Sequence, residues 1–147
     1  MSARAGKNRK SFDELTTKEL YEILKSRAEI FVKEQKISYV DPDGVDCKSW
    51  HVFATEGGRV CAYLRAFKDG DGIIKIGRVL TLVHGNGTGS QLMKYAISEL
   101  KAKTGCKKIV MDAQSHAISF YQKLGFKITS EEYLEEGIPH VDMELAL

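Results

Sequence analysis

The chain has 147 residues, of which 43% are hydrophobic, and a formal net charge of +2 at pH 7. This length fits one domain that can bury a proper core. The near balance of 22 basic and 20 acidic side chains predicts no nucleic-acid or membrane partner. The sequence also lacks an apolar run of about 18 residues and an apolar signal-peptide segment. We therefore expect a single-domain cytoplasmic protein.

The cysteines and histidines form no metal-binding pattern. The cysteines are widely spaced without a C-x-x-C motif, which suits packed thiols in a reducing compartment; they are Cys47, Cys61 and Cys106. The histidines show no ligand spacing with one another; they are His51, His84, His116 and His140. We therefore expect no metal site.

The first ten residues are rich in basic side chains, together with Gly and Ser. This composition predicts a flexible, solvated basic tail over residues 1–10. The folded domain is expected over residues 11–147, and it begins with a short strand at Ser11–Leu15.

A long helix is predicted next. Thr16 and Glu19 match a capping box, in which each side chain bonds to the main chain of the other residue. Apolar residues then recur on one helical face as far as Phe31. We expect the helix to end at about Lys33 or Lys36.

Alternation of apolar and polar residues predicts an antiparallel meander in the middle of the chain. Turn sequences at Glu56–Arg59 and Asp69–Gly72 separate its strands. The three predicted strands are Trp50–Thr55, Val60–Phe67 and Ile73–Leu82.

The third strand runs into a glycine-rich turn, Val83–Gly89, and then into an amphipathic helix. Glycine lets the main chain approach a ligand, and the N–H groups at a helix N-terminus point toward it. The turn therefore predicts a phosphate site. The dinucleotide pattern G-x-G-x-x-G fails at Ser90, and no lysine follows Gly89 as a nucleotide-triphosphate loop requires.

The second half of the chain completes an α+β pattern. Gly105 is expected to end the helix, and Lys108–Ala113 to return as a strand parallel to Ile73–Leu82. The later elements are a helix at His116–Leu124 capped by Ser115, a strand from Phe126, a turn at Glu135–Gly137 and a strand at Pro139–Leu147. This order predicts a mixed sheet with flanking helices.

Two separated motifs are similar to those of the GNAT superfamily of acyl-CoA N-acyltransferases. The glycine turn resembles the family's [Arg/Gln]-x-x-Gly-x-[Gly/Ala] loop, with Gly87 and Gly89 at the glycine positions. His84 stands where the family prefers Arg or Gln. Ser119–Phe126 resembles the family's A-x-x-F-Y-x-x-x-G-F segment.

Further segments are similar to the ElaA-like branch of that family. Arg27–Gln35 resembles its R-x-x-V-F-V-x-E-Q motif, and the other matching segments are Ile76–Val79, Asp112–His116 and Glu136–His140. The resemblance covers nearly the whole chain, from about residue 12. It implies the GNAT fold: a mixed, mostly antiparallel sheet with a central splay and flanking helices.

The resemblance implies direct transfer of an acetyl group from acetyl-CoA to a primary amine in a ternary complex. The glycine turn would bind the pyrophosphate, and the pantetheine arm would lie in the splay. A main-chain N–H near Leu80–Leu82 would polarise the thioester carbonyl. The implied cofactor-binding residues are Leu80, Thr81, Leu82, His84, Gly85, Asn86, Gly87, Thr88, Gly89, Ser90, Gln114, Ser119 and Tyr121.

Tyr121 is the candidate general acid that protonates the departing thiolate. A phenol with a pKa of about 10 is protonated at pH 7 and roughly matches a thiol with a pKa of about 8.5. The general base is open: Glu34 is the leading candidate, and His140 and His51 are alternatives. Candidates to line the acceptor pocket are Tyr63, Arg65 and Arg78.

An alternative function is a non-catalytic CoA-binding sensor or interaction module with the same fold. The near-neutral charge leaves the acceptor open among polyamines, amino sugars, amino acids and protein amines. We expect a small-molecule or peptide amine as the partner. The final strand, with Val141, Met143 and Leu145, offers a surface for a homodimer.

Overall fold

A computed structural model describes residues 6–36, 41–82 and 85–147 of the chain. The strands are β1 (Gly6–Ser11), β2 (Trp50–Glu56), β3 (Arg59–Gly70), β4 (Ile73–Thr81), β5 (Lys108–Gln114), β6 (Lys127–Ile128), β7 (Tyr133–Glu135) and β8 (Ile138–Ala146). The main helices are α1 (Thr17–Arg27), its π-helical continuation η3 (Ala28–Glu34), α2 (Thr88–Thr104) and α3 (Ile118–Lys123). Short 3-10 turns are η2 (Phe12–Glu14), η4 (Val45–Lys48) and η5 (Ser115–Ala117).

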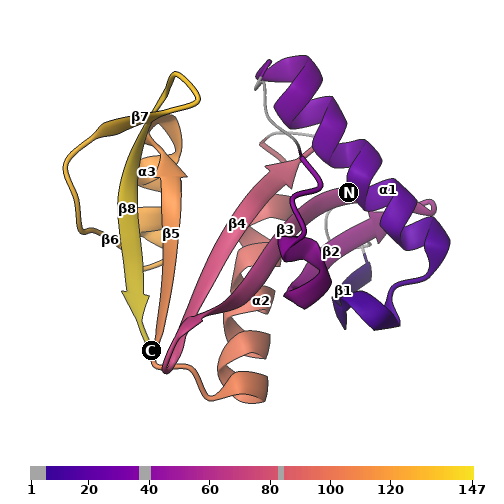
Figure 1. Ribbon diagram of the computed structural model, residues 1–147, viewed down its shortest axis with the longest axis horizontal. Coiled ribbons are helices and arrows are strands. Elements are labelled where there is room, and N and C mark those ends of the chain that lie inside the picture. The colour runs from indigo at the N-terminus through magenta and orange to yellow at the C-terminus, as the bar shows by residue number, and fades with distance from the viewer. Residues whose placement is uncertain (1–5, 37–40, 83–84) are drawn as a thin grey trace.

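One mixed sheet forms the centre of the molecule, and helices cover both of its faces (Figure 1). The strand order is β1-β2-β3-β4-β5-β8-β6, and β7 also pairs with β8. Neighbouring strands are antiparallel except for β4 and β5, which are parallel. The predicted meander of three antiparallel strands and the parallel return strand are therefore confirmed.

The predictions for the N-terminus are wrong. Instead of belonging to a solvated tail, Gly6–Ser11 forms β1, which pairs antiparallel with β2. The strand predicted at Ser11–Leu15 is the 3-10 turn η2. Residues 1–5 of the predicted tail lie outside the described residues.

Ion pairs explain why basic residues of this segment are ordered. The Arg9 Nε atom lies 3.1 Å from Glu99 Oε1 on α2, and Lys10 Nζ lies 2.9 Å from Glu19 Oε2 on α1. Both acidic partners are distant in sequence or lie on another element, so composition alone could not reveal them.

The capping box that begins α1 is confirmed. Glu19 N–H donates to Thr16 Oγ1 at 3.1 Å, and Thr16 N–H donates to Glu19 Oε1 at 2.9 Å. The helix ends within the predicted range, but its last part is π-helical, with Gln35 N–H donating to Ile30 C=O at 2.8 Å. Propensity does not predict this widening, which occurs frequently at functional sites.

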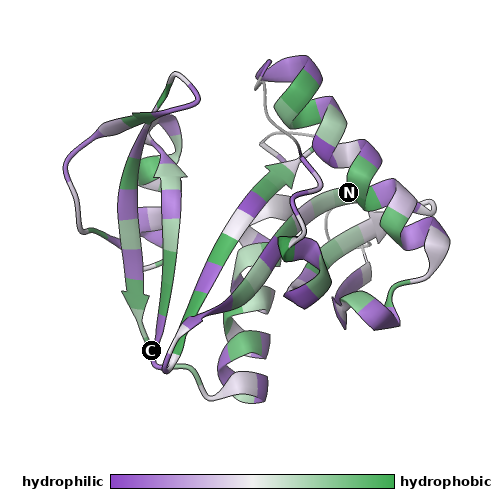
Figure 2. Cartoon of the chain, in the orientation of Figure 1, coloured by the Kyte–Doolittle hydropathy of each residue, from purple (hydrophilic) through white to green (hydrophobic). Residues whose placement is uncertain are grey.

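Two hydrophobic clusters lie on opposite faces of the sheet. Along β2, Val52 and Ala54 belong to the cluster under α2 and α3, whereas Phe53 belongs to the cluster under α1 and η3. This is the two-residue period of a strand buried on both faces. Figure 2 shows that α1 carries both hydrophobic and hydrophilic residues. Its buried residues are Ile23, Ser26 and Arg27.

The sheet opens in its centre. β4 and β5 pair only from Ile73 with Lys108 to Ile76 with Met111, although β4 continues to Thr81 and β5 to Gln114. Figure 1 shows the two strands diverging beyond this point. The predicted central splay is therefore confirmed.

The final strand does not form a free surface. β8 lies between β5 on one side and β6 and β7 on the other. Val141 and Met143 are buried in the chain's own core. These two side chains are therefore already packed within the chain. No helix among the described residues is long and apolar enough to cross a membrane.

Candidate active site

A cleft of about 1440 Å³ occupies the splay between β4 and β5. Its walls come from η3, β4, the glycine turn, the start of α2, the end of β5, α3 and the turn between β7 and β8. The predicted site residues that line it are Glu34, Leu80, Thr81, Gly85, Asn86, Gly87, Gly89, Ser90, Gln114, Tyr121 and His140. The structure thus brings together residues that are up to about a hundred positions apart in the chain.

Three predicted cofactor ligands do not line the cleft. The Leu82 N–H donates to Cys61 C=O at 2.9 Å, so it serves the β3–β4 ladder. Thr88 is buried, with its N–H bonded to Asn86 Oδ1 at 3.1 Å. Ser119 is exposed on α3. His84 lies outside the described residues.

The glycine turn brings the main chain close to β4. Gly87 is the N-cap of α2 with φ of 82°, a left-handed conformation that favours glycine. A Cβ atom on Gly89 would lie 3.0 Å from Thr81 Cγ2, which is too close for an ordinary contact. Both glycines therefore have a steric reason to be there, and the first turn of α2 borders the cleft at Gly89 and Ser90.

Charge differs between the two ends of the cleft. The first turn of α2 has no acidic residue, and Lys94 and Lys123 line this end. A helix N-terminus carries partial positive charge, so this end suits an anion. Among the described residues the carboxylates that line the cleft come from elements other than α2: Glu34, Asp43, Asp112, Glu135 and Glu136.

Tyr121 has the environment of a proton donor. Its ring is buried, edge-to-face with Phe120 at 5.1 Å and Phe126 at 6.0 Å between centroids. Within the part of the chain that the structure describes, its hydroxyl has no hydrogen-bond partner, and the residue lines the cleft. Burial raises the pKa of Tyr121 to about 12, so the phenol is protonated at neutral pH.

His140 on β8 is the strand partner of Gln114, the last residue of β5. Its Nδ1 atom donates to Ile138 C=O at 2.7 Å, because a carbonyl can only accept. In the neutral ring the Nε2 atom then carries the lone pair, and it lies 3.6 Å from Glu135 Oε2. The ring stacks on Tyr133 with 6.0 Å between centroids, so the Ile138 carbonyl and the Tyr133 ring set its orientation.

Glu34 ends η3 and is exposed at the cleft. The next residue, Gln35, exchanges two hydrogen bonds with Gln114, of 3.3 Å and 2.9 Å. Gln114 Oε1 also bonds to His116 Nε2 at 2.6 Å. Gln114 therefore joins η3 to β5 across the cleft, a contact that its predicted role as a cofactor ligand did not include.

His51 does not belong to the cleft. It is fully buried, and its Nε2 atom donates to Asp46 C=O at 2.9 Å. Its Nδ1 atom therefore accepts from the Tyr63 hydroxyl at 2.7 Å. Burial lowers the pKa of His51, and both ring nitrogens are occupied. His51 is thus a structural histidine, and Tyr63 is equally buried beneath the pocket that it was predicted to line.

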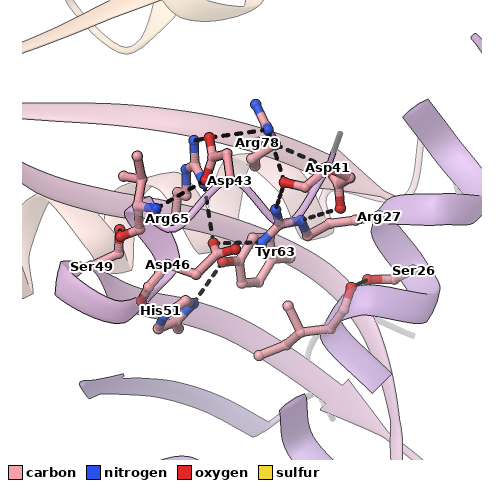
Figure 3. A network of polar contacts seen from close by, with 12 residues as sticks. Ser26, Arg27, Asp41, Asp43, Asp46, Ser49, His51, Tyr63, Arg65 and Arg78 are labelled. Atoms are coloured by element: carbon pink, nitrogen blue, oxygen red, sulfur yellow. Dashed lines mark hydrogen bonds and ion pairs between the residues drawn. The ribbon is translucent and has the colours of Figure 1, made fainter. Parts of the chain in front are cut away.

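Sequence reasoning missed a partly buried network of three arginines and three aspartates beside the cleft (Figure 3). Arg27 from α1 is fully buried and bonds to Asp41 Oδ2 at 2.9 Å and Asp46 Oδ1 at 2.7 Å. Arg65 from β3 forms a two-pronged pair with Asp43, at 2.8 Å for both bonds. The clue was the aspartate-rich stretch 41–46, which precedes the first strand of the meander.

Arginine partners lower the pKa of two aspartates in this network. The hydrogen bonds from Arg65 hold the pKa of Asp43 well below its usual range. Burial alone would raise the pKa of Asp46, but hydrogen bonds from Arg27 and Arg65 outweigh burial and lower it. Arg65 and Arg78 line the cleft as predicted. Ion pairs with Asp43 and Asp41, respectively, neutralise their charges.

Comparisons with known proteins agree with this geometry. Residues 17–147 match the acetyltransferase (GNAT) domain. A UPF0039 protein of Schizosaccharomyces pombe is 38% identical, over 94% of this chain and 95% of its own. ElaA of Escherichia coli is 35% identical, over 88% of this chain and 89% of its own.

Solved structures give the same result. An acyl-CoA N-acyltransferase from Pseudomonas aeruginosa superposes with a TM-score of 0.90 at 36% identity, over 97% of this chain and 99% of its own. The crystal structure of E. coli ElaA has the same TM-score of 0.90, over 96% of this chain and 99% of its own. A Bacillus subtilis acetyltransferase solved in complex with CoA shares the fold at a TM-score of 0.71 and 21% identity, over 98% of this chain and 99% of its own. The predicted acyl-CoA N-acyltransferase fold is confirmed.

The network predicts a pH-dependent stability. Asp46→Asn leaves buried Arg27 and Arg65 short of a charged acceptor and should lower the free energy of unfolding by about 3–5 kcal/mol at pH 7. The lowered folded-state pKa values of Asp43 and Asp46 give stability that is complete above their unfolded pKa of about 4 and is lost as the pH falls through the folded values. Urea titrations from pH 7 to pH 2 should show the gap between wild type and variant shrinking in acid. Exposed Asp71→Asn is the control, and a gap of constant size would contradict the assignment.

Proposed function

Because the chain belongs to the GNAT acetyltransferase family, alongside ElaA, we propose that it transfers an acetyl group from acetyl-CoA to a primary amine. Donor and acceptor would meet in a ternary complex for direct transfer. One observation carries this proposal: a single cleft joins the N-terminus of α2 to the protonated Tyr121 hydroxyl and to His140. The charge difference along the cleft agrees, with an anion at one end and an ammonium group at the other.

The donor fits the positive end. The N–H groups at the start of α2 and the side chains of Lys94 and Lys123 would hold the pyrophosphate and phosphate groups. The pantetheine arm would lie along the splay, where β4 and β5 no longer pair. The B. subtilis relative in the same fold binds CoA, which supports this assignment.

We assign the polarisation of the thioester carbonyl to the edge of β4 that faces β5. Main-chain groups alternate along a strand. Since the Leu82 N–H points to β3, the main-chain groups of alternate residues of β4 point the other way, toward β5. A donor aimed at the carbonyl oxygen would stabilise the negative charge that develops there.

The proton transfers follow from the side chains around the cleft. A base takes a proton from the ammonium group, and the amine nitrogen then attacks the thioester carbonyl. The C–S bond breaks as the C–N bond is completed, and the departing thiolate takes the Tyr121 proton. The attacking nitrogen releases its second proton to become the amide, and this proton restores the Tyr121 phenol. The raised pKa of Tyr121 ensures that this proton is present at neutral pH.

The geometry favours His140 over Glu34 as the base. The bond from Nδ1 to Ile138 C=O leaves the Nε2 lone pair available, and Glu135 can stabilise the imidazolium that forms. Glu34 is exposed at the rim, where it can attract the ammonium group.

Calorimetric titration of acetyl-CoA into the protein tests the donor site. We expect micromolar affinity, and at least about tenfold weaker binding by Gly89→Val, because the added side chain displaces Thr81 from the glycine turn. The control is Gly6→Val in β1, where a Cβ atom lies 3.6 Å from Thr55 Oγ1. Absence of binding at millimolar ligand would refute the proposal. An assay of thiol release measures turnover of amines. Binding of acetyl-CoA without turnover of any amine would support the CoA-binding module instead.

Tyr121→Phe should lower kcat by about 10²–10⁴-fold, the usual contribution of a positioned general acid. The affinity for acetyl-CoA should stay the same, because the ring that packs on Phe120 and Phe126 is kept. Tyr95→Phe on α2 is the matched control, since it removes a phenol outside the cleft. Unchanged turnover in Tyr121→Phe would remove this residue from the mechanism.

One substitution at each candidate base distinguishes their roles. His140→Gln should lower kcat by about 10²-fold or more. Glu34→Gln should act mainly on the KM of the amine, because a rim carboxylate contributes attraction rather than proton transfer. Steady-state kinetics with one amine acceptor measures both. The opposite pattern, with kcat lost in Glu34→Gln and kept in His140→Gln, would reverse the assignment.

A further inference from the structure

Arg78 has a main-chain conformation that its residue type disfavours. Its φ is 52°, in the left-handed region where a Cβ atom crowds the carbonyl group. It is not a glycine, although Gly77 directly precedes it. Strain of this kind persists only where the surroundings impose it.

The strain occurs where β4 turns away from β5. Ile76 is the last residue of β4 that pairs with β5. On the other side, Arg65 lies opposite Gly77 and Tyr63 opposite Leu80, so β4 carries one residue more than β3 at this point. Such a bulge bends its strand, and here it sets the direction in which Leu80 and Thr81 continue along the cleft.

Ion pairs hold Arg78 in place. Its Nε atom donates to Asp41 Oδ1 at 3.0 Å, and its Nη2 atom to Asp41 C=O at 3.1 Å. The other carboxylate oxygen of Asp41 accepts from Arg27 Nε at 2.9 Å, and Arg27 Nη2 reaches the same carbonyl at 2.9 Å. Asp41 thus lies between two guanidinium groups, one of them fully buried (Figure 3). We name Arg27, Asp41 and Arg78 the arginine clamp.

Stability alone does not account for the arginine clamp. A buried ion pair stabilises a fold no better than apolar side chains of similar volume. A glycine at position 78 would also form the bulge without strain. What the clamp adds is a rigid link from α1 to the strand edge that borders the cleft.

We propose that Arg27 and Asp41 are positioning residues that hold Arg78, and through it the bulge of β4, in the one conformation that accepts the acyl-CoA thioester. This inference rests on the proposed function for the identity of the ligand. The clamp acts through the main chain of β4 and not through the charge of Arg78. Its effect is therefore on acetyl-CoA affinity and on the order of β4.

A rescue by glycine tests this inference. Arg78→Ala removes the ion pairs of the arginine clamp but keeps the free-energy cost of a left-handed conformation at a non-glycine residue. The bulge conformation that binds acetyl-CoA is then less populated, and the Kd for acetyl-CoA should rise about tenfold. Arg78→Gly removes the clamp and the cost together, so its Kd should return to within about threefold of wild type. Arg59→Ala is the control, because Arg59 forms an exposed ion pair with Glu29 and neither residue lines the cleft.

The opposite result would assign the role to charge. If Arg78→Gly binds as weakly as Arg78→Ala while Arg78→Lys binds like wild type, the guanidinium attracts the ligand directly and the inference is overturned. Absence of binding by wild type itself would overturn the proposed function and leave the clamp to the next measurement.

Amide hydrogen exchange in the free protein tests, without any ligand, whether the arginine clamp orders β4. In Asp41→Asn the Leu82 amide, bonded to Cys61 C=O in the wild type, should exchange at least about tenfold faster. The same amide should be unchanged in Arg59→Ala. Equal protection of Leu82 in wild type and Asp41→Asn would show that the bulge holds itself, and would overturn the inference.

Discussion

The cleft depends on the point at which β4 and β5 stop pairing, after Ile76 and Met111. Two parallel strands that diverge inside a sheet expose main-chain donors and acceptors that water or a ligand must satisfy. A long, flexible arm with amide groups of its own can fill such a gap. The N-terminus of α2 lies at one end of the gap, so one ligand can span both features. The bulge at Arg78 marks where this divergence begins.

Burial and hydrogen bonding decide which polar groups can react. Tyr121 has an apolar surround that keeps its proton, and its hydroxyl faces the cleft. His51 and His140 are both almost fully buried, yet they differ in what their ring nitrogens contact. In His51 both nitrogens are bonded, whereas in His140 a carbonyl holds Nδ1 and leaves Nε2 for chemistry. Both were candidate bases in the sequence, and they differ in the contacts of their ring nitrogens.

The acceptor side of the cleft is built on balanced charge. Arg65 and Arg78 reach the surface of the cleft with aspartates behind them, so they present shape and hydrogen-bond donors without a net positive field. Glu135 and Glu136 at the tip of the β7–β8 turn and Glu34 at the end of η3 complete this wall. In the proposed reaction a protonated amine would meet these carboxylates, and the anionic donor would meet the lysines and the helix N–H groups.

The sequence by itself determined the features that depend on neighbouring residues. These include the capping box at Thr16, the three-stranded meander, the glycine turn with its helix, and the segment that carries Tyr121. Only the tertiary structure decided that Gly6–Ser11 is a strand, that Gln35 bridges to Gln114, and that Arg27 is buried among aspartates. The reason is physical: periodicity and turn chemistry act over a few residues, whereas an ion pair or a strand edge is completed by a partner far along the chain.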